Sequence, residues 1–329
     1  MKLFNKIIIC LIAIVVSATP LFAADNNPYS RGLSSFEFTE YEPLKDRPIT
    51  VYCYIPTKGD IQNMRVLFML HGAGRKPLIS MKAWNQFAER DGFIVIAPQY
   101  DMKLYPGWRY QTGGVVYKDK VQPRENWTYN TIEAIFDHFK KHTGSKAEVY
   151  DMFGHSAGGQ FTHRFALAMP HARLNIGVAA NAGHWTMPLV DGMPSITTDK
   201  KYGWPYSVKG TPLADTEVLK KFLSRKLYIQ AGKDDVKTSG KWVPKGDKAL
   251  SQGEHRLGRA RNMYKTSKKV AKKNKWEFNW EKVEVKGVGH NSKGMIYGTF
   301  TLDENGKKKF SMDNITKTGA YYILYQLNK

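Results

Sequence analysis

The sequence predicts an α/β fold in which a mainly parallel central sheet carries helices on both faces. The composition of the 329-residue chain, 42% hydrophobic and 24% charged, is ordinary for a soluble globular protein. Short apolar, β-branched runs alternate with longer segments of helical periodicity, which is typical of parallel α/β sheets. The turn GHSAGG at 154–159 joins one such apolar run to one such helix. We expect a single domain over residues 24–329.

An N-terminal segment, residues 1–23, stands apart from this domain. The basic MKLFNK is followed by the apolar IIICLIAIVVSA, which has the length of a signal-peptide core and is short for a membrane span. Small residues in TPLFA offer cleavage after Ala23. We expect a signal peptide and a periplasmic or secreted protein, with an uncleaved membrane anchor as the alternative. No later segment is apolar enough to cross a membrane.

Removal of this leader has two consequences. Cys53 becomes the only cysteine, so the mature domain forms no internal disulfide, and its apolar surroundings predict a buried thiol rather than a catalytic one. The formal net charge falls from +21 to +19 because the leader holds Lys2 and Lys6 and no acid. Such a charge attracts anionic partners, among them an anionic polysaccharide. The alternative is a solvated lysine surface without a dedicated partner, and no nucleic-acid partner is expected.

The regular elements are expected in chain order. The helix that begins at residue 157 carries Phe161, Phe165 and Met169 on one apolar stripe, and Pro170 ends it. Strands are expected at 49–55, 65–70, 93–98, 148–153, 175–181, 226–231 and 277–285, and helices at 80–92, 126–144, 157–169, 255–273 and 316–326.

Two irregular segments interrupt this alternation. Residues 183–216 are rich in Gly, Pro and Trp, and residues 102–125 contain YPGWRYQTGG. Long irregular segments in compact domains are usually functional, so we interpret 183–216 as a cap-like insertion or pocket wall. A hairpin is expected at 298–312.

Ser156 lies at the centre of the motif G-x-S-x-G, between a strand and a helix. This setting raises a serine above the carboxyl edge of a sheet. Gly154 and Gly158 suit a turn that brings the strand and helix backbones too close for side chains. The helix N-terminus then directs N–H groups at an oxygen that gains negative charge. We interpret Ser156 as a nucleophile; the alternative is a glycine-rich turn without chemistry.

A nucleophilic serine needs a base, and the base needs an orienting acid. His290 lies in the glycine-containing loop GVGHNSKG just after a predicted strand. The segment LYIQAGKDD places Asp234 and Asp235 after another strand. The order Ser156, Asp235, His290 is the order of α/β hydrolases, and we prefer Asp235 with Asp234 as the alternative. His155 adjoins the serine, but we expect its side chain to point elsewhere.

The segment His71-Gly72-Ala73-Gly74 follows the predicted strand at 65–70. It resembles the H-G-G-G-type loop that donates a backbone N–H to a tetrahedral intermediate. We expect the backbone N–H groups of Ala73 and Ala157 to form an oxyanion hole.

These motifs together resemble those of α/β-hydrolase-fold serine hydrolases across most of residues 45–328. Within that superfamily, LHGAGRKP…W…FAERDGFIVIAPQYD resembles secreted polyhydroxybutyrate depolymerases and feruloyl-esterase-like enzymes, and more distantly dienelactone hydrolases. The resemblance implies an ester bond as target and neither a metal nor an organic cofactor. The tail beyond His290 is longer than this resemblance leads us to expect.

Aromatic and basic residues in the irregular segments are candidates for substrate contacts. Trp108, Trp185 and Trp204 are suited to sugar or aromatic rings, or alternatively anchor long loops. Arg75 follows the oxyanion loop and could pair with a substrate carboxylate, or could face solvent.

We therefore expect a secreted serine carboxylesterase that cleaves a polysaccharide-linked, aryl or polyester bond through an acyl-enzyme intermediate. Two alternatives stay open. One is a serine peptidase of the oligopeptidase type, although no gating domain is visible in the sequence. The other is a non-catalytic protein of the same fold that binds an anionic polymer, against which the complete set of Ser, Asp, His and oxyanion loop argues.

Overall fold

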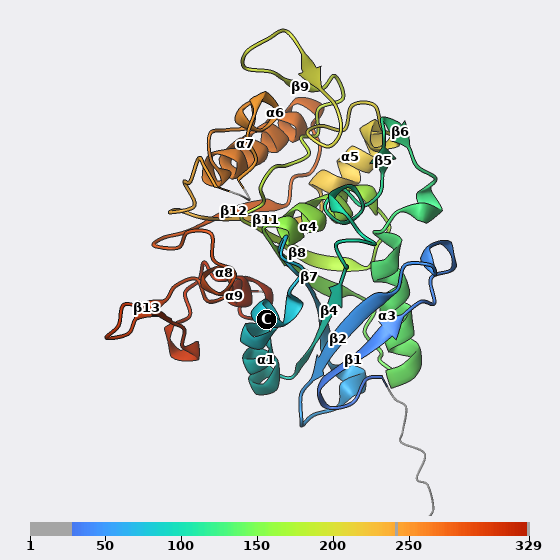
Figure 1. Ribbon diagram of the computed structural model, residues 1–329, viewed down its shortest axis with the longest axis vertical. Coiled ribbons are helices and arrows are strands. Elements are labelled where there is room, and N and C mark those ends of the chain that lie inside the picture. Colours follow the sequence, from blue (N-terminus) through green and yellow to red (C-terminus); the bar gives the residue numbers. More distant parts are fainter. Residues whose placement is uncertain (1–27, 241–242, 328–329) are drawn as a thin grey trace, which may run out of the picture.

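The structure, a computed structural model, describes residues 28–240 and 243–327. Its centre is an eight-stranded sheet (Figure 1). The strands are β1 (Gly32–Phe38), β2 (Ile49–Ile55), β3 (Arg65–Leu70), β4 (Phe93–Gln99), β7 (Tyr150–His155), β8 (Leu174–Ala180), β11 (Lys226–Gly232) and β12 (Trp280–Val285). Their order is β1-β2-β4-β3-β7-β8-β11-β12. β2 is antiparallel to both of its neighbours and the remaining pairs are parallel, which confirms the predicted mainly parallel sheet.

Helices cover both faces of this sheet, as the sequence predicted. One face packs against α3 (Asn130–Thr143), α4 (Ala157–Ala168), α5 (Thr216–Leu223) and α7 (Arg256–Asn274). The other face packs against α1 (Pro77–Asp91), α8 (Ser292–Tyr297) and α9 (Ala320–Tyr325), which lie together in Figure 1. Two short helices, α2 (Gly107–Tyr110) and α6 (Asp247–Leu250), lie in connecting segments.

The central strands alternate between the two hydrophobic cores. In β3, the side chains of Val66, Phe68 and Leu70 belong to the core on the α3–α4 face. Leu67 and Met69 belong to the core on the α1 face. Helices cover both faces of the sheet, so the residues that point to either face are apolar. The sequence of β3 is therefore one continuous apolar run.

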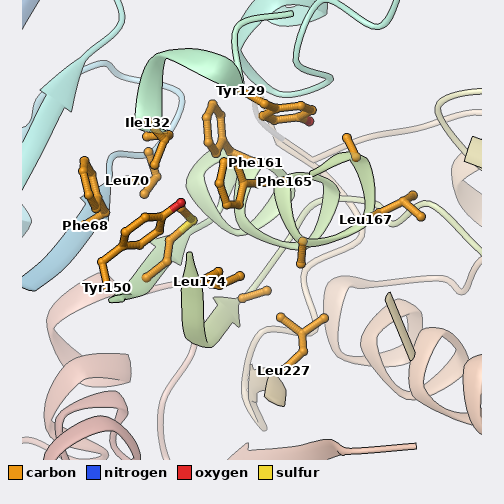
Figure 2. Packing of buried hydrophobic residues seen from close by; sticks show 14 of the residues in the cluster. Phe68, Leu70, Tyr129, Ile132, Tyr150, Phe161, Phe165, Leu167, Leu174 and Leu227 are labelled. Carbon is orange, nitrogen blue, oxygen red and sulfur yellow. The ribbon is translucent and has the colours of Figure 1, made fainter. Parts of the chain in front are cut away.

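Helix α4 is buried on all sides. Each of its residues from Ala157 to Ala168 is buried, because the helix lies between the sheet, α5 and the loops that follow β4 and β8. Figure 2 shows Phe161 and Phe165 beside Tyr129, and the ring centroids of Tyr129 and Phe161 are 4.8 Å apart. Phe161 and Phe165 of the predicted stripe therefore pack in the core, whereas Met169 is half-buried and follows the last residue of the helix.

Several elements differ from the expected ones. β1 was not predicted, because its inner and outer residues alternate and its sequence, GLSSFEF, is short of apolar residues. α5 and α8 were also missed, since eight and six residues are too few to show helical periodicity. The expected hairpin is present as β13 (Thr301–Leu302) paired with β14 (Lys308–Lys309). The segment 183–216 holds one pair of short strands, β9 (Met193–Pro194) and β10 (Lys201–Tyr202), and one 3₁₀ turn.

Some expectations fall outside the described residues. The signal peptide at 1–23 and its cleavage after Ala23 lie there. No helix within 28–240 and 243–327 has the length and apolar character that crossing a bilayer requires.

The prediction of a buried thiol at Cys53 is confirmed. Cys53 is fully buried in β2, and burial raises the pKa of its thiol.

The turn between β7 and α4, which carries Ser156, brings the helix backbone close to the sheet. Ser156 adopts φ 59° and ψ −113°, a left-handed conformation that a residue with a side chain rarely occupies. It is held because Ser156 N donates to Ala180 O at 2.9 Å and Ser156 O accepts from Gln160 N at 3.0 Å. A Cβ atom on Gly158 would lie 2.2 Å from the carbonyl oxygen of Leu70. Gly158 therefore lets α4 approach β3.

We predict that Gly158→Ala lowers the free energy of unfolding by about 2–4 kcal/mol or prevents folding, because backbone atoms must move to admit the methyl group. Gly74→Ala is the matched control, since a Cβ there meets nothing within 4 Å. Denaturant unfolding followed by circular dichroism measures both. Equal stability of the two variants would contradict the close packing described for the turn.

Candidate active site

Three side chains from three loops meet at the carboxyl edge of the sheet. His290 Nε2 lies 3.0 Å from Ser156 Oγ, and His290 Nδ1 lies 2.7 Å from Asp235 Oδ2. The side chain of Asp235 is 1% exposed, whereas Asp234 is exposed to solvent. The structure thus brings Asp235, and not its neighbour, to the imidazole. The three residues chosen from the sequence form one chain of hydrogen bonds.

Asp235 has a second partner that the sequence did not reveal. Arg256, the first residue of α7, places Nη1 3.2 Å from Asp235 Oδ1, and both side chains are buried. A carboxylate buried without a cation would be costly, and this ion pair offsets that cost. The bond also fixes the carboxylate plane, so that the other oxygen faces His290. No motif marks Arg256, because it lies 21 residues from its partner in sequence.

Asn181 joins the loops that carry the acid and the base. It follows β8 with φ 46°, a conformation that asparagine tolerates better than most residues. Its Oδ1 accepts from Gly232 N at 2.7 Å, and its Nδ2 donates to Gly289 O at 3.1 Å. The side chain therefore ties the start of the Asp235 loop to the residue before His290. The sequence feature that could have identified Asn181 is its position as the last residue of the predicted strand at 175–181.

The position of His155 corrects the sequence-based expectation that its side chain points away. Its ring centroid lies 4.6 Å from that of His290. The reason is that His155 is still the last residue of β7, and the loop with His290 folds over this same strand end. Burial lowers the pKa of His155 well below its usual value, and the charges of His290 and Arg256 lower it further. His155 is therefore a neutral ring packed against His290.

The loop after β3 lies across the cavity from the helix N-terminus. Ala73 and Ala157 both line the cavity that contains Ser156. Ala157 is the first residue of α4, so its N–H has no intrahelical acceptor. His71 braces the opposite loop: Nε2 accepts from Tyr100 N at 3.1 Å, so Nδ1 carries the proton and donates to Gly72 O at 2.9 Å. Burial lowers the pKa of His71 to about 3, which keeps this ring neutral.

The cavity beside Ser156 has a volume of about 350 Å³ and a mainly polar wall. Among the described residues that line it, Lys245 is the one lysine or arginine, and none is an aspartate or glutamate. The lining consists of Ala73, Gln111, Ser156, Ala157, Gln160, Gly183, His184, Tyr206, Val243, Pro244 and Lys245. Gln160 lies one helical turn after Ser156 and could have been found by spacing. Ala73, Ser156 and Ala157 were predicted from the motifs, whereas the remaining lining residues come from loops and could not be found by spacing.

The predicted substrate-contacting residues divide between two environments. Trp108 and Trp204 line an adjoining cavity of about 380 Å³ that shares Gln111 and His184 with the first. Trp185 is fully buried against His163, with ring centroids 4.8 Å apart, and anchors its loop. Trp185 is therefore a loop anchor, whereas substrate contact by Trp108 and Trp204 stays a prediction.

Arg75 does not line the cavity of Ser156. It is 7% exposed, its guanidinium carbon lies 4.2 Å from the centroid of the Tyr110 ring, and Nη2 donates to Tyr105 O at 2.7 Å. Neither a substrate contact nor a solvated side chain fits this position, because the loop after β4 folds over the guanidinium.

The structure has a second, larger groove away from Ser156. A groove of about 800 Å³ between residues 187–196 and α7 shares no lining residue with the cavity of Ser156. In the part of the chain that the structure describes, no three His, Cys, Asp or Glu side chains are grouped so that they could hold a metal ion.

The sequence matches no model of a protein family, and no curated protein matches it. Among solved structures, poly(aspartic acid) hydrolase-1 from Sphingomonas sp. KT-1 is 35% identical with a TM-score of 0.74, over 80% of this chain and 96% of that chain. LpqC, a poly(3-hydroxybutyrate) depolymerase from Bordetella parapertussis, is 26% identical with a TM-score of 0.74, over 86% of this chain and 92% of that chain. A ferulic acid esterase is 14% identical with a TM-score of 0.49, over 79% and 91% of the two chains.

An identity of 35% over nearly the whole Sphingomonas chain, together with a shared fold, shows that the two proteins have a common family. The similarity to LpqC confirms the resemblance to polyhydroxybutyrate depolymerases that the sequence motifs indicated. The chain belongs to the α/β-hydrolase-fold serine hydrolases.

Proposed function

We propose that this enzyme cleaves carboxylic esters through an acyl-enzyme on Ser156, with His290 as the base and Asp235 as the acid that orients it. The observation that carries this proposal is the continuous path of hydrogen bonds from Asp235 through His290 to Ser156, with distances of 2.7 and 3.0 Å. A nucleophile, a base within reach of it and a third group that orients the base are the three requirements of such catalysis.

The reaction begins when His290 Nε2 accepts the proton of Ser156 Oγ as this oxygen attacks the ester carbonyl carbon. The carbonyl oxygen becomes an oxyanion, and the N–H groups of Ala73 and Ala157 stabilise it. The carbon–oxygen bond to the alcohol then breaks, and the alcohol leaves with the proton from His290. Water next attacks the acyl carbon while His290 takes its proton, and the acid leaves as Ser156 recovers its hydrogen.

A second candidate function is the hydrolysis of an anionic polymer. The 35% identical Sphingomonas protein is named as a poly(aspartic acid) hydrolase, and poly(aspartic acid) is an amide-linked chain with one carboxylate per unit. The formal net charge, +21 for the full chain and +19 without residues 1–23, favours encounter with such a polymer or with an ester on an anionic or polysaccharide carrier. The same catalytic groups would serve both reactions.

Ser156→Ala and His290→Ala are each expected to lower kcat for p-nitrophenyl butyrate by several orders of magnitude, because the groups act as a unit. Initial rates with this ester and with poly(aspartic acid) test both candidate functions in one series. Circular dichroism checks that each variant is folded. Near-normal ester turnover in folded His290→Ala would mean that another group is the base.

Asp235→Asn is expected to lower kcat by about 10⁴-fold, since an amide donates to Nδ1 and stabilises the wrong imidazole tautomer. Asp234→Asn, which makes the same change one residue away on an exposed side chain, is expected to stay within about threefold of the wild type. The reverse ranking would transfer the orienting role to Asp234.

We also propose that the protein is exported and that residues 1–23 are removed, on the basis of the basic and apolar pattern of that segment. The intact mass of protein made with its full N-terminus in a bacterial host is expected to correspond to a chain that begins at Ala24. A membrane-bound chain that retains Met1 would instead favour the anchor.

A further inference from the structure

Two arginines lie buried behind the cavity of Ser156. Arg164 of α4 and Arg259 of α7 are both fully buried, and no carboxylate pairs with either within residues 28–240 and 243–327. Arg259 donates to the carbonyl oxygens of Gly183 and Pro244 at 2.8 and 3.0 Å, two residues of the cavity wall. Because a buried charge interacts strongly across a poorly solvated interior, both guanidinium groups favour negative charge in the cavity.

Arg164 lies two helical turns after Ser156 and reaches the wall of the cavity. Burial lowers its pKa to about 10, so it is charged at neutral pH. All of its partners are neutral. They are Thr186 Oγ1 at 2.8 Å, Gln111 O at 2.9 Å, Gln160 O and Oε1 at 3.5 and 3.4 Å, Pro205 O at 3.3 Å and His184 Nδ1 at 2.8 Å.

The contact between Arg164 and His184 sets the imidazole tautomer. A guanidinium has only donors, so Nδ1 of His184 must accept, and the single ring proton lies on Nε2. Burial lowers the pKa of His184 well below its usual value, and the charges of Arg164 and Arg259 lower it further. His184 is therefore a neutral ring whose Nε2–H is a fixed donor, and it is unsuited to proton transfer at neutral pH.

His184 lines both the cavity of Ser156 and the adjoining cavity. Its ring stacks on Tyr206, with centroids 4.8 Å apart and an interplanar angle of 27°, which holds its orientation. Among the described residues, Nε2 has no hydrogen-bond partner. Lys245 is exposed at the same cavity, and none of the lining residues that the structure describes is an aspartate or glutamate.

We propose that His184 and Lys245 form a carboxylate-binding subsite beside Ser156, so that the enzyme prefers esters that carry a carboxylate in the acyl or the alcohol part. Nε2–H of His184 donates to one carboxylate oxygen, and Lys245 supplies the opposite charge. Arg164 is a positioning residue that acts through His184. This assignment rests on the proposed role of Ser156 as the nucleophile.

The test compares kcat/KM for matched anionic and neutral esters at 0.15 M salt, where long-range attraction is screened beyond about 8 Å. Monomethyl glutarate and methyl valerate form the acyl-side pair, and 4-acetoxybenzoate and phenyl acetate form the alcohol-side pair. The wild-type enzyme is expected to prefer the anionic member of one pair by about 10–100-fold, the range of a hydrogen bond to a charged group. The pair that responds shows which part of the ester the subsite binds.

Three variants assign that preference to its residues. His184→Asn keeps an acceptor near Arg164 but lacks the reach of Nε2, and Lys245→Met removes the charge; each is expected to lower the anionic-to-neutral ratio about tenfold. His184→Gln, which can place an amide donor near the position of Nε2, is expected to restore part of the ratio. Lys248→Met removes the same charge from a residue outside the cavity and is the matched control.

Two outcomes overturn the subsite. One is an anionic-to-neutral ratio of kcat/KM near one for both pairs in the wild-type enzyme. If the neutral esters are hydrolysed in that case, the proposed role of Ser156 is unaffected. The other is an equal loss of ratio in Lys245→Met and Lys248→Met, which would assign the preference to net charge.

A second readout does not depend on turnover. In the Ser156→Ala variant with glutarate as the probe, the imidazole ¹⁵N shifts of His184 are expected to report the neutral Nε2–H tautomer and to change as glutarate binds. The Nδ1–H tautomer, or shifts that do not respond to glutarate, would also overturn the assignment.

Discussion

The left-handed backbone at Ser156 is the constraint on which the site depends. It turns the chain from β7 into α4 within one residue, so that the serine stands at the sheet edge and Ala157 begins the helix. The conformation persists because backbone bonds to β8 and to α4 hold it, and because Gly158 admits close contact with β3. Asp235 and His290 reach Ser156 because the loops that carry them begin where β11 and β12 end, at the same edge of the sheet.

Much of the fold followed from the sequence because its central strands are buried on both faces. The predicted runs at 49–55 and 65–70 coincide with β2 and β3. Prediction failed where burial is one-sided or the element is short. The sequence of β1, GLSSFEF, has few apolar residues and no regular apolar alternation, and α8 has only six residues. Local periodicity cannot identify elements that tertiary packing stabilises.

Ser156, His290 and Asp235 could be selected from motif and chain order, whereas the residues that hold their loops in place could not. Asn181 and Arg256 hold the acid and base loops through contacts 21 or more residues away in sequence, and neither belongs to a motif. The contacts within the cavity wall could not be predicted either. Arg164, from a different segment, donates to Nδ1 of His184 and so leaves the ring proton on Nε2, and only the folded structure reveals this pairing. The proposed carboxylate preference therefore depends on a contact of a buried arginine that the sequence alone does not display.

Covalent labelling with a fluorophosphonate tests the central claim most directly. Such a probe reacts with a serine that a neighbouring base has activated, so it reports the nucleophile without any assumption about substrate. We predict one adduct per chain on the peptide that contains Ser156, lost in Ser156→Ala and formed far more slowly in His290→Ala. An adduct on another serine, or labelling that persists in Ser156→Ala, would contradict the assignment of Ser156 as the catalytic nucleophile.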